Sequence, residues 1–240
     1  MPDADVNLYL DPVCPSAWMT SKWLRLVLAQ RDYAVDWRFI SLRLINANVD
    51  YDSHFPAGYE AGHTAGLRLL RVAARVRTEH GREAAGALYA AMGARIFDPR
   101  RGGLRRWRAP REPPVRRTHP HRRGPAGRAG RRAGRSWLRR RAAPRDRRGP
   151  RVDRQGRRNP IIHFRPPDGV TFFGPMISRL PSEEEALPLW DNVVGLATFS
   201  GFAELKRSLR ELPQLRGLGV EPDEVGGQED WHGGSRRRKR

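Results

Sequence analysis

Residues 6–24, VNLYLDPVCPSAWMTSKWL, decide the fold expected for this chain. Five residues of strand-forming character, 6–10, end at a polar Asp-Pro break, and a helical spacing of apolar residues begins at Pro15. Cys14, the only cysteine among 240 residues, stands between the two. This order predicts a strand, a sharp turn and a helix, with a thiol at the mouth of the helix.

The rest of the chain continues a β-α-β pattern that is interrupted and then resumed. The expected elements are a strand at 34–42, an irregular stretch at 43–58, helices at 59–79 and 82–95, a hairpin with strands at 160–164 and 170–173, and helices at 182–197 and 202–212. The sequence therefore predicts an α/β protein with a thioredoxin-like core and a helical insertion. The expected divisions are 5–42 and 159–213 for the two halves of the core, 43–99 for the insertion, 100–158 for an Arg-rich segment and 214–240 for a disordered tail.

The position of Cys14 has a chemical consequence. Unpaired N–H groups and the positive end of the helix dipole favour a thiolate at a helix N-terminus, so this position predicts a lowered pKa and a nucleophile. The alternative is a buried cysteine that acts as a small apolar residue. Position alone leaves both interpretations open.

The formal net charge of +20 comes from one segment. Residues 100–158 hold 24 arginines, no lysine and three acidic residues, a net charge of +21, so the other 181 residues together carry −1. This segment consists almost wholly of Arg, Gly, Pro and Ala and lacks the apolar residues that would offset the entropy cost of ordering it.

Three explanations of the Arg-rich segment remain open. It is a nucleic-acid-binding insertion, a disordered insertion without a partner, or a stretch read in a shifted frame of GC-rich DNA. The absence of lysine favours the third explanation. With suitable synonymous codons, a one-base shift before Pro160 turns the printed residues into Asp-Val-Gly-Thr.

Several stretches lie on both sides of that segment, over about 5–98 and 160–212, and they read DPVCPSAW, FISLRLIN, EHG, PIIHF, FFGPMISR, LW and FAELKR. Together they resemble the DsbA/FrnE-like branch of the thioredoxin superfamily, and most closely the actinobacterial mycothiol-dependent nitroreductase family. The resemblance implies a thiol-dependent oxidoreductase in which Cys14 is the redox-active residue.

The same resemblance assigns further residues to the pocket around the thiol. Pro160 would be the cis-proline that lies against the thiol, preceded by Asn159 where the family has threonine. Asn46 and Tyr59 match positions that line the pocket. The residues alone also allow alternatives to these roles. Pro160 is then the start of an edge strand, Asn46 a turn residue and Tyr59 a partly buried helix residue.

The motif departs from the family at two positions. Where the family commonly has Cys-Pro-Trp-Cys or Cys-Pro-Trp-Ala, this chain has Cys14, Pro15, Ser16 and Ala17. Ala17 removes the resolving thiol, so an external small thiol, mycothiol or a similar one, has to resolve a mixed disulfide on Cys14. Ser16 replaces an aromatic residue that stacks on flat substrates, which puts the preference for nitroaromatic substrates in doubt.

The remaining expectations are coarser. No metal-ligand spacing is present, His163 reads as a strand residue, and Trp18 reads as a core residue. A single cysteine and the lack of a signal peptide or transmembrane run favour a cytoplasmic protein. A homodimer is a possible assembly, and no membrane partner is expected. The competing functions are a non-enzymatic Arg-rich nucleic-acid-binding protein and a family member inactivated by a frameshift.

Overall fold

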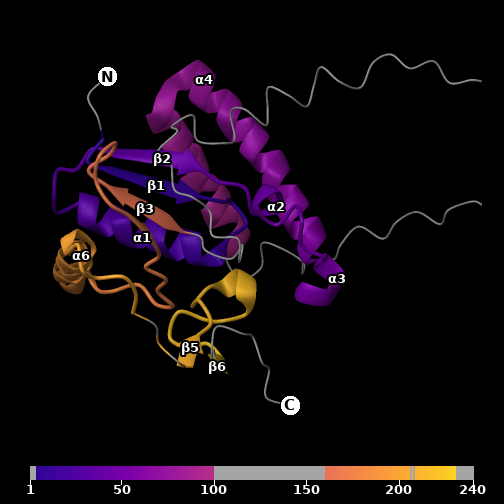
Figure 1. Ribbon diagram of the computed structural model, residues 1–240. Helices are drawn as coiled ribbons and strands as arrows, with labels where there is room; N and C mark the ends of the chain where they lie inside the picture. The colour runs from indigo at the N-terminus through magenta and orange to yellow at the C-terminus, as the bar shows by residue number, and fades with distance from the viewer. Residues whose placement is uncertain (1–3, 100–159, 206, 208, 231–240) are drawn as a thin grey trace, which may run out of the picture.

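The structure, a computed structural model, describes residues 4–99, 160–205, 207 and 209–230. Its centre is a four-stranded mixed sheet in the order β2-β1-β3-β4 (Figure 1). β1 (Val6–Leu10) runs parallel to β2 (Val35–Phe39) and antiparallel to β3 (Ile161–Phe164), which pairs antiparallel with β4 (Thr171–Phe173). The predicted strands and the predicted hairpin are confirmed, and the arrangement is consistent with a thioredoxin-like core.

β1 is the centre of the core because all five of its residues are buried. Its side chains alternate between the two faces of the sheet, as strand geometry requires. Val6, Leu8 and Leu10 belong to a large apolar cluster with residues of the helices, and Tyr9 belongs to a smaller cluster with Ile161. The turn before Cys14 is therefore attached directly to a buried strand.

Two helices pack together over the large cluster. α1 (Pro15–Leu28) and α6 (Glu183–Thr198) contact each other, and the rings of Trp23 and Trp190 meet edge to face with their centroids 5.5 Å apart. α6 begins with a capping box, in which Ser182 and Glu185 each bond the other's backbone N–H. This confirms the helix predicted at 182–197.

The described part of the insertion between β2 and β3 consists of α2 (Leu42–Ile45), α3 (Tyr51–His54) and α4 (Tyr59–Phe97). The two short helices occupy the stretch predicted to be irregular, and Ser41 and Asp50 cap them. α4 begins beside α3, extends past α2 to the top of the view and then turns back, so that its second half lies against the sheet (Figure 1). Its backbone leaves helical geometry at Gly81, with φ 86° and ψ −177°, which agrees with the two helices predicted on either side.

The C-terminal prediction is wrong in two places. Residues 202–212 do not form a helix: β5 (Leu209–Glu211) pairs with β6 (Gln228–Asp230), and a 3₁₀ turn, η1 (Arg216–Leu218), lies between them. The predicted disordered tail is wrong for residues 214–230, since Leu215 and Val220 are buried. Pairing between strands distant in sequence overrides local helical spacing here, and two isolated apolar residues anchor a stretch whose composition is polar.

Candidate active site

Cys14 is the N-cap residue of α1 and is 7% exposed. Its backbone is extended, with φ −92° and ψ 112°, and its Sγ accepts a hydrogen bond from the Ala17 N–H at 3.5 Å. Pro15 occupies the first turn, where its missing N–H leaves no helix bond unmade. The predicted placement of the thiol at the helix mouth is confirmed.

The predicted lowering of the thiol pKa is wrong for this structure. Burial raises the pKa of Cys14 to about 12, and the nearby Asp11 carboxylate raises it further. The N–H groups of Ala17 and Ser16 oppose this rise without reversing it. Desolvation of an anion outweighs two backbone dipoles here, because the thiol is buried and the groups that shift its pKa include no cation.

Asp11 is a site residue that the sequence analysis missed. Its side chain is fully buried, Oδ1 accepts from the Val13 N–H at 3.0 Å, and Oδ2 accepts from the Leu42 N–H at 2.7 Å. Burial raises the pKa of Asp11 to about 6. One carboxylate therefore fastens both the turn before Cys14 and the start of α2. The signal available in the sequence was an acidic residue directly after an apolar strand.

α4 presses closely on this turn through Gly66. A Cβ at that position would lie 2.6 Å from Val13 Cγ2 and 2.8 Å from Asp11 Oδ1. Only glycine allows so close an approach without displacing the turn. The insertion thus forms one wall of the site.

Asn46 ends α2 and is buried. Its Nδ2 donates to the Leu42 carbonyl at 2.8 Å, while its Oδ1 has no hydrogen-bond partner in the described part of the chain. Asn46 lies four residues after Leu42, whose backbone N–H donates to the Asp11 carboxylate. Asn46 therefore has a structural bond and one buried acceptor still available.

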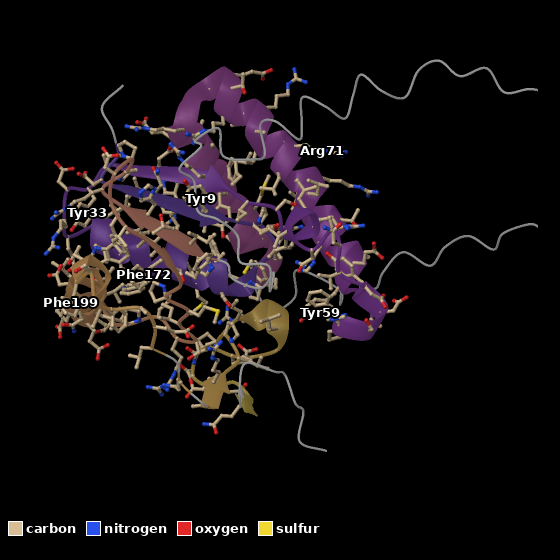
Figure 2. All side chains as sticks on the ribbon, viewed as in Figure 1. Tyr9, Tyr33, Tyr59, Arg71, Phe172 and Phe199 are labelled. Carbon is tan, nitrogen blue, oxygen red and sulfur yellow. The ribbon has the colours of Figure 1, made fainter. Side chains whose placement is uncertain are left out.

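Tyr59 is the first residue of α4 and lies at the end of that helix next to α3 (Figure 2). It is 37% exposed, stacks on Phe55 with ring centroids 5.5 Å apart, and meets the His63 ring edge to face at 5.8 Å. The Tyr51 hydroxyl and His63 Nδ1 are 2.9 Å apart. The structure thus places Tyr59 in an aromatic group of the insertion, together with Tyr51, Phe55 and His63.

Pro160 immediately precedes β3 and is buried, and its carbonyl accepts from the Gly174 N–H at 2.8 Å. The register of β1 and β3 pairs Tyr9 with Ile161, so Pro160 stands at the end of the sheet from which the Cys14 turn leaves β1. Asn159 lies outside the described residues. The cis state of the bond between these two residues stays a prediction.

Trp18 and His163 lie where the sequence predicts, in the core and in a strand respectively. Trp18 is buried, donates from Nε1 to the Asp98 carboxylate at 3.0 Å and packs close to Gly93. His163 is buried in β3, opposite Asn7 on one side and Thr171 on the other. Both belong to the framework around the site.

Across the described residues, no three His, Cys, Asp or Glu side chains gather as metal ligands would. Among the same residues, no helix combines the length and apolar character needed to cross a membrane. The Arg-rich segment, 100–158, lies outside the described residues, so the structure does not bear on its predicted disorder.

The fold and site define an α/β protein whose lone cysteine caps the helix that follows the first strand. The family described as "Rv2466c-like: Mycothiol-dependent nitroreductase Rv2466c" matches residues 13–106 and 145–207, and this chain belongs to it. The interruption of the match, 107–144, falls inside the Arg-rich segment.

One curated protein is similar to this chain over a shorter stretch. The uncharacterized protein Rv2286c of Mycobacterium tuberculosis (strain ATCC 25618 / H37Rv) is 39% identical over 72 residues, which is 30% of this chain and 30% of that protein. The chain therefore aligns with less than two thirds of that relative's length, and that likeness assigns no activity.

Proposed function

We propose that this protein is a thiol-dependent oxidoreductase in which Cys14 is the nucleophile and an external small thiol resolves the covalent intermediate. The observation that carries the proposal is the place of the thiol: Cys14 Sγ lies at the N-terminus of α1, 3.5 Å from the Ala17 N–H. Membership in a family of mycothiol-dependent nitroreductases supports mycothiol as that thiol.

With a disulfide as substrate, the proposed cycle has two exchanges. The Cys14 thiolate attacks one sulfur of the substrate, a mixed disulfide forms on Cys14, and the other sulfur leaves as a thiolate. A small thiol then attacks the substrate sulfur of the mixed disulfide. The Cys14 thiolate leaves, and the small thiol and the substrate sulfur depart together as a disulfide. Ala17 offers no second thiol, and the chain has no other cysteine, so the second attack must come from outside.

With a nitro compound as acceptor, the electron balance is the same. Two thiols become one disulfide and supply two electrons and two protons, which convert a nitro group to a nitroso group and water. Ser16 provides no aromatic surface at the thiol turn for a flat substrate. We therefore place disulfides before nitroaromatics as the first substrate class to test.

The test compares the wild-type protein with Cys14→Ser, using mycothiol as reductant and a mycothiol mixed disulfide of a model thiol as substrate. The wild-type protein should accumulate one mycothiol adduct on Cys14, visible in the intact mass, and should turn over substrate. Cys14→Ser should do neither. Ser53→Ala, a hydroxyl loss on the insertion, is the matched control and should behave as wild type. Turnover that survives Cys14→Ser would overturn the proposal.

A further inference from the structure

We infer that Thr20, in the helix that Cys14 caps, is a positioning residue that fixes the place of Pro160 relative to the thiol. Its hydroxyl acts through Gly174 and Pro175, the two residues that follow β4. The inference rests on the proposed function, since it concerns where a substrate meets Cys14. It assigns to the site a residue that lies outside the thiol motif.

The first observation is the direction of the Thr20 hydrogen bond. Thr20 is fully buried in α1, and its hydroxyl donates to the Pro175 carbonyl at 2.8 Å. A threonine inside a helix can donate to the carbonyl four residues before it. Thr198 does so, with Val194 as the acceptor at 2.9 Å. Thr20 instead bonds a residue 155 positions away, so its hydroxyl connects α1 to the segment after β4.

The second observation is that the same segment holds Pro160. The Gly174 N–H donates to the Pro160 carbonyl at 2.8 Å. Gly174 has φ 101°, a left-handed conformation that favours glycine. The next residue, Pro175, is the one that accepts from Thr20. Two adjacent residues therefore join α1 on one side to the start of β3 on the other.

The third observation is that both ends of this link are held in the core. Thr20 lies six residues after Cys14 in the same helix, and every α1 residue from Ala17 to Ser21 is buried. Pro160 is buried too, and it is followed directly by β3, which is buried along its whole length. The place of Pro175 therefore helps to set how Pro160 lies relative to the first turn of α1.

The place of Pro160 bears on the proposed reaction. The pairing of β1 with β3 puts Pro160 at the end of the sheet from which the Cys14 turn leaves β1. A substrate that reaches Cys14 on this side would have Pro160 beside it. Reaction rates fall steeply when the reacting groups are misplaced, even by about 1 Å. Thr20 would therefore affect the attack on the substrate without contacting the sulfur.

The thiol itself does not depend on the Thr20 hydroxyl. The groups that shift the pKa of Cys14 besides burial are Asp11 and the backbone N–H groups of Ala17 and Ser16. Loss of the hydroxyl should therefore leave the reaction of Cys14 with a small reagent unchanged. This separates a positioning role from a change in the thiol.

The test compares the wild-type protein with Thr20→Val, which keeps the branched shape of the side chain and loses the hydroxyl. We expect the Gly174 amide proton to exchange with deuterium about tenfold faster in the variant, as followed by NMR, because its bond to Pro160 loses support. The value of kcat/KM for a mycothiol mixed disulfide of a model thiol should fall about tenfold. Alkylation of Cys14 by iodoacetamide should stay within twofold of wild type.

Thr20→Ser and Thr198→Val are the matched controls. Thr20→Ser keeps the hydroxyl, and Thr198→Val removes a hydroxyl whose bonds lie within its own helix. Both variants should stay within twofold of wild type in all three measurements.

An unchanged Gly174 exchange rate in Thr20→Val would overturn the inference, and so would a kcat/KM within twofold of wild type. A Thr20→Val protein that does not fold, or that exposes Cys14 to faster alkylation, would show that Thr20 only holds the core together. A Thr20→Ser protein that behaves like Thr20→Val would show that the methyl group matters instead, and either result would overturn the inference as well. Amide exchange needs no substrate, so the Gly174 result stands whether or not Cys14→Ser abolishes turnover.

Discussion

Asp11 and Leu42 are joined by a short hydrogen bond, 2.7 Å from the Leu42 N–H to Oδ2 of the carboxylate. The bond ties the end of β1 to the first residue of the insertion. The other carboxylate oxygen holds the Val13 N–H, one residue before Cys14. Because a single buried side chain makes both bonds, the thiol turn and the insertion should move and unfold together.

The charge of Asp11 should make stability depend on pH. Its folded pKa of about 6 lies above its ordinary value of 3.8, so stability is fully present below about pH 4 and falls as the pH rises through 6. The shift corresponds to at most about 3 kcal/mol. Asp11→Asn should remove this slope from urea-unfolding free energies measured between pH 4 and 7.

Asp191→Asn is the control for that experiment, because the ion pair with Arg31 holds the pKa of the Asp191 carboxyl below its ordinary value of 3.8, so that Asp191 is charged throughout this range. Asp191→Asn should keep the wild-type slope between pH 4 and 7. Asp11→Asn should also speed the alkylation of Cys14, since it removes a negative charge that raises the thiol pKa. Parallel pH curves for wild type and Asp11→Asn would contradict this account.

The close approach of α4 to the thiol turn gives a matched pair of glycine substitutions. Gly66→Ala should destabilise the protein by about 1–3 kcal/mol, because its Cβ would overlap Val13 and Asp11. Gly62→Ala, one turn earlier with nothing within 4 Å, should stabilise it by about 0.5–1 kcal/mol through helix propensity. Urea unfolding measures both. Equal effects at the two positions would show that α4 does not press on the turn.

The sequence predicted the framework well because local patterns encode it. The apolar run at 6–10, the serine cap at 182 and the glycine at 81 each determine structure within a few residues. The C-terminal pairing of β5 with β6 escaped prediction because its partners are far apart in sequence and neither is strongly apolar.

The site was harder to predict than the fold. Position at a helix N-terminus suggested a low thiol pKa, but the direction of the shift depends on burial, and α4 packs closely on the thiol turn at Gly66. Asp11 belongs to no motif in the sequence. Its importance comes from its bond to Leu42 in the insertion, and local spacing does not encode such a contact.

Mass spectrometry of tryptic peptides from the native host, across residues 95–165, tests the frame of the Arg-rich segment. A shifted frame predicts a peptide that reads Gly-Thr before Pro160 in place of Arg158 and Asn159. Such a peptide would remove the +21 charge of residues 100–158 and leave an ordinary family member. Peptides that match the printed sequence would contradict the shift and make salt-dependent nucleic-acid binding the next measurement.

Ala17→Cys should give the protein its own resolving thiol. Ala17 is three residues after Cys14, and its N–H already points at the Cys14 sulfur, so a thiol there completes a Cys-X-X-Cys arrangement at the helix N-terminus. The variant should form an internal disulfide, release the small-thiol adduct from Cys14 and depend less on the concentration of mycothiol for resolution. Thiol titration and the intact mass follow both effects. Ala17→Ser, which adds a side chain of similar size without redox chemistry, should retain the adduct. An Ala17→Cys protein that keeps two free thiols under oxidising conditions would show that this turn cannot close a disulfide, and would leave the external thiol as the sole route.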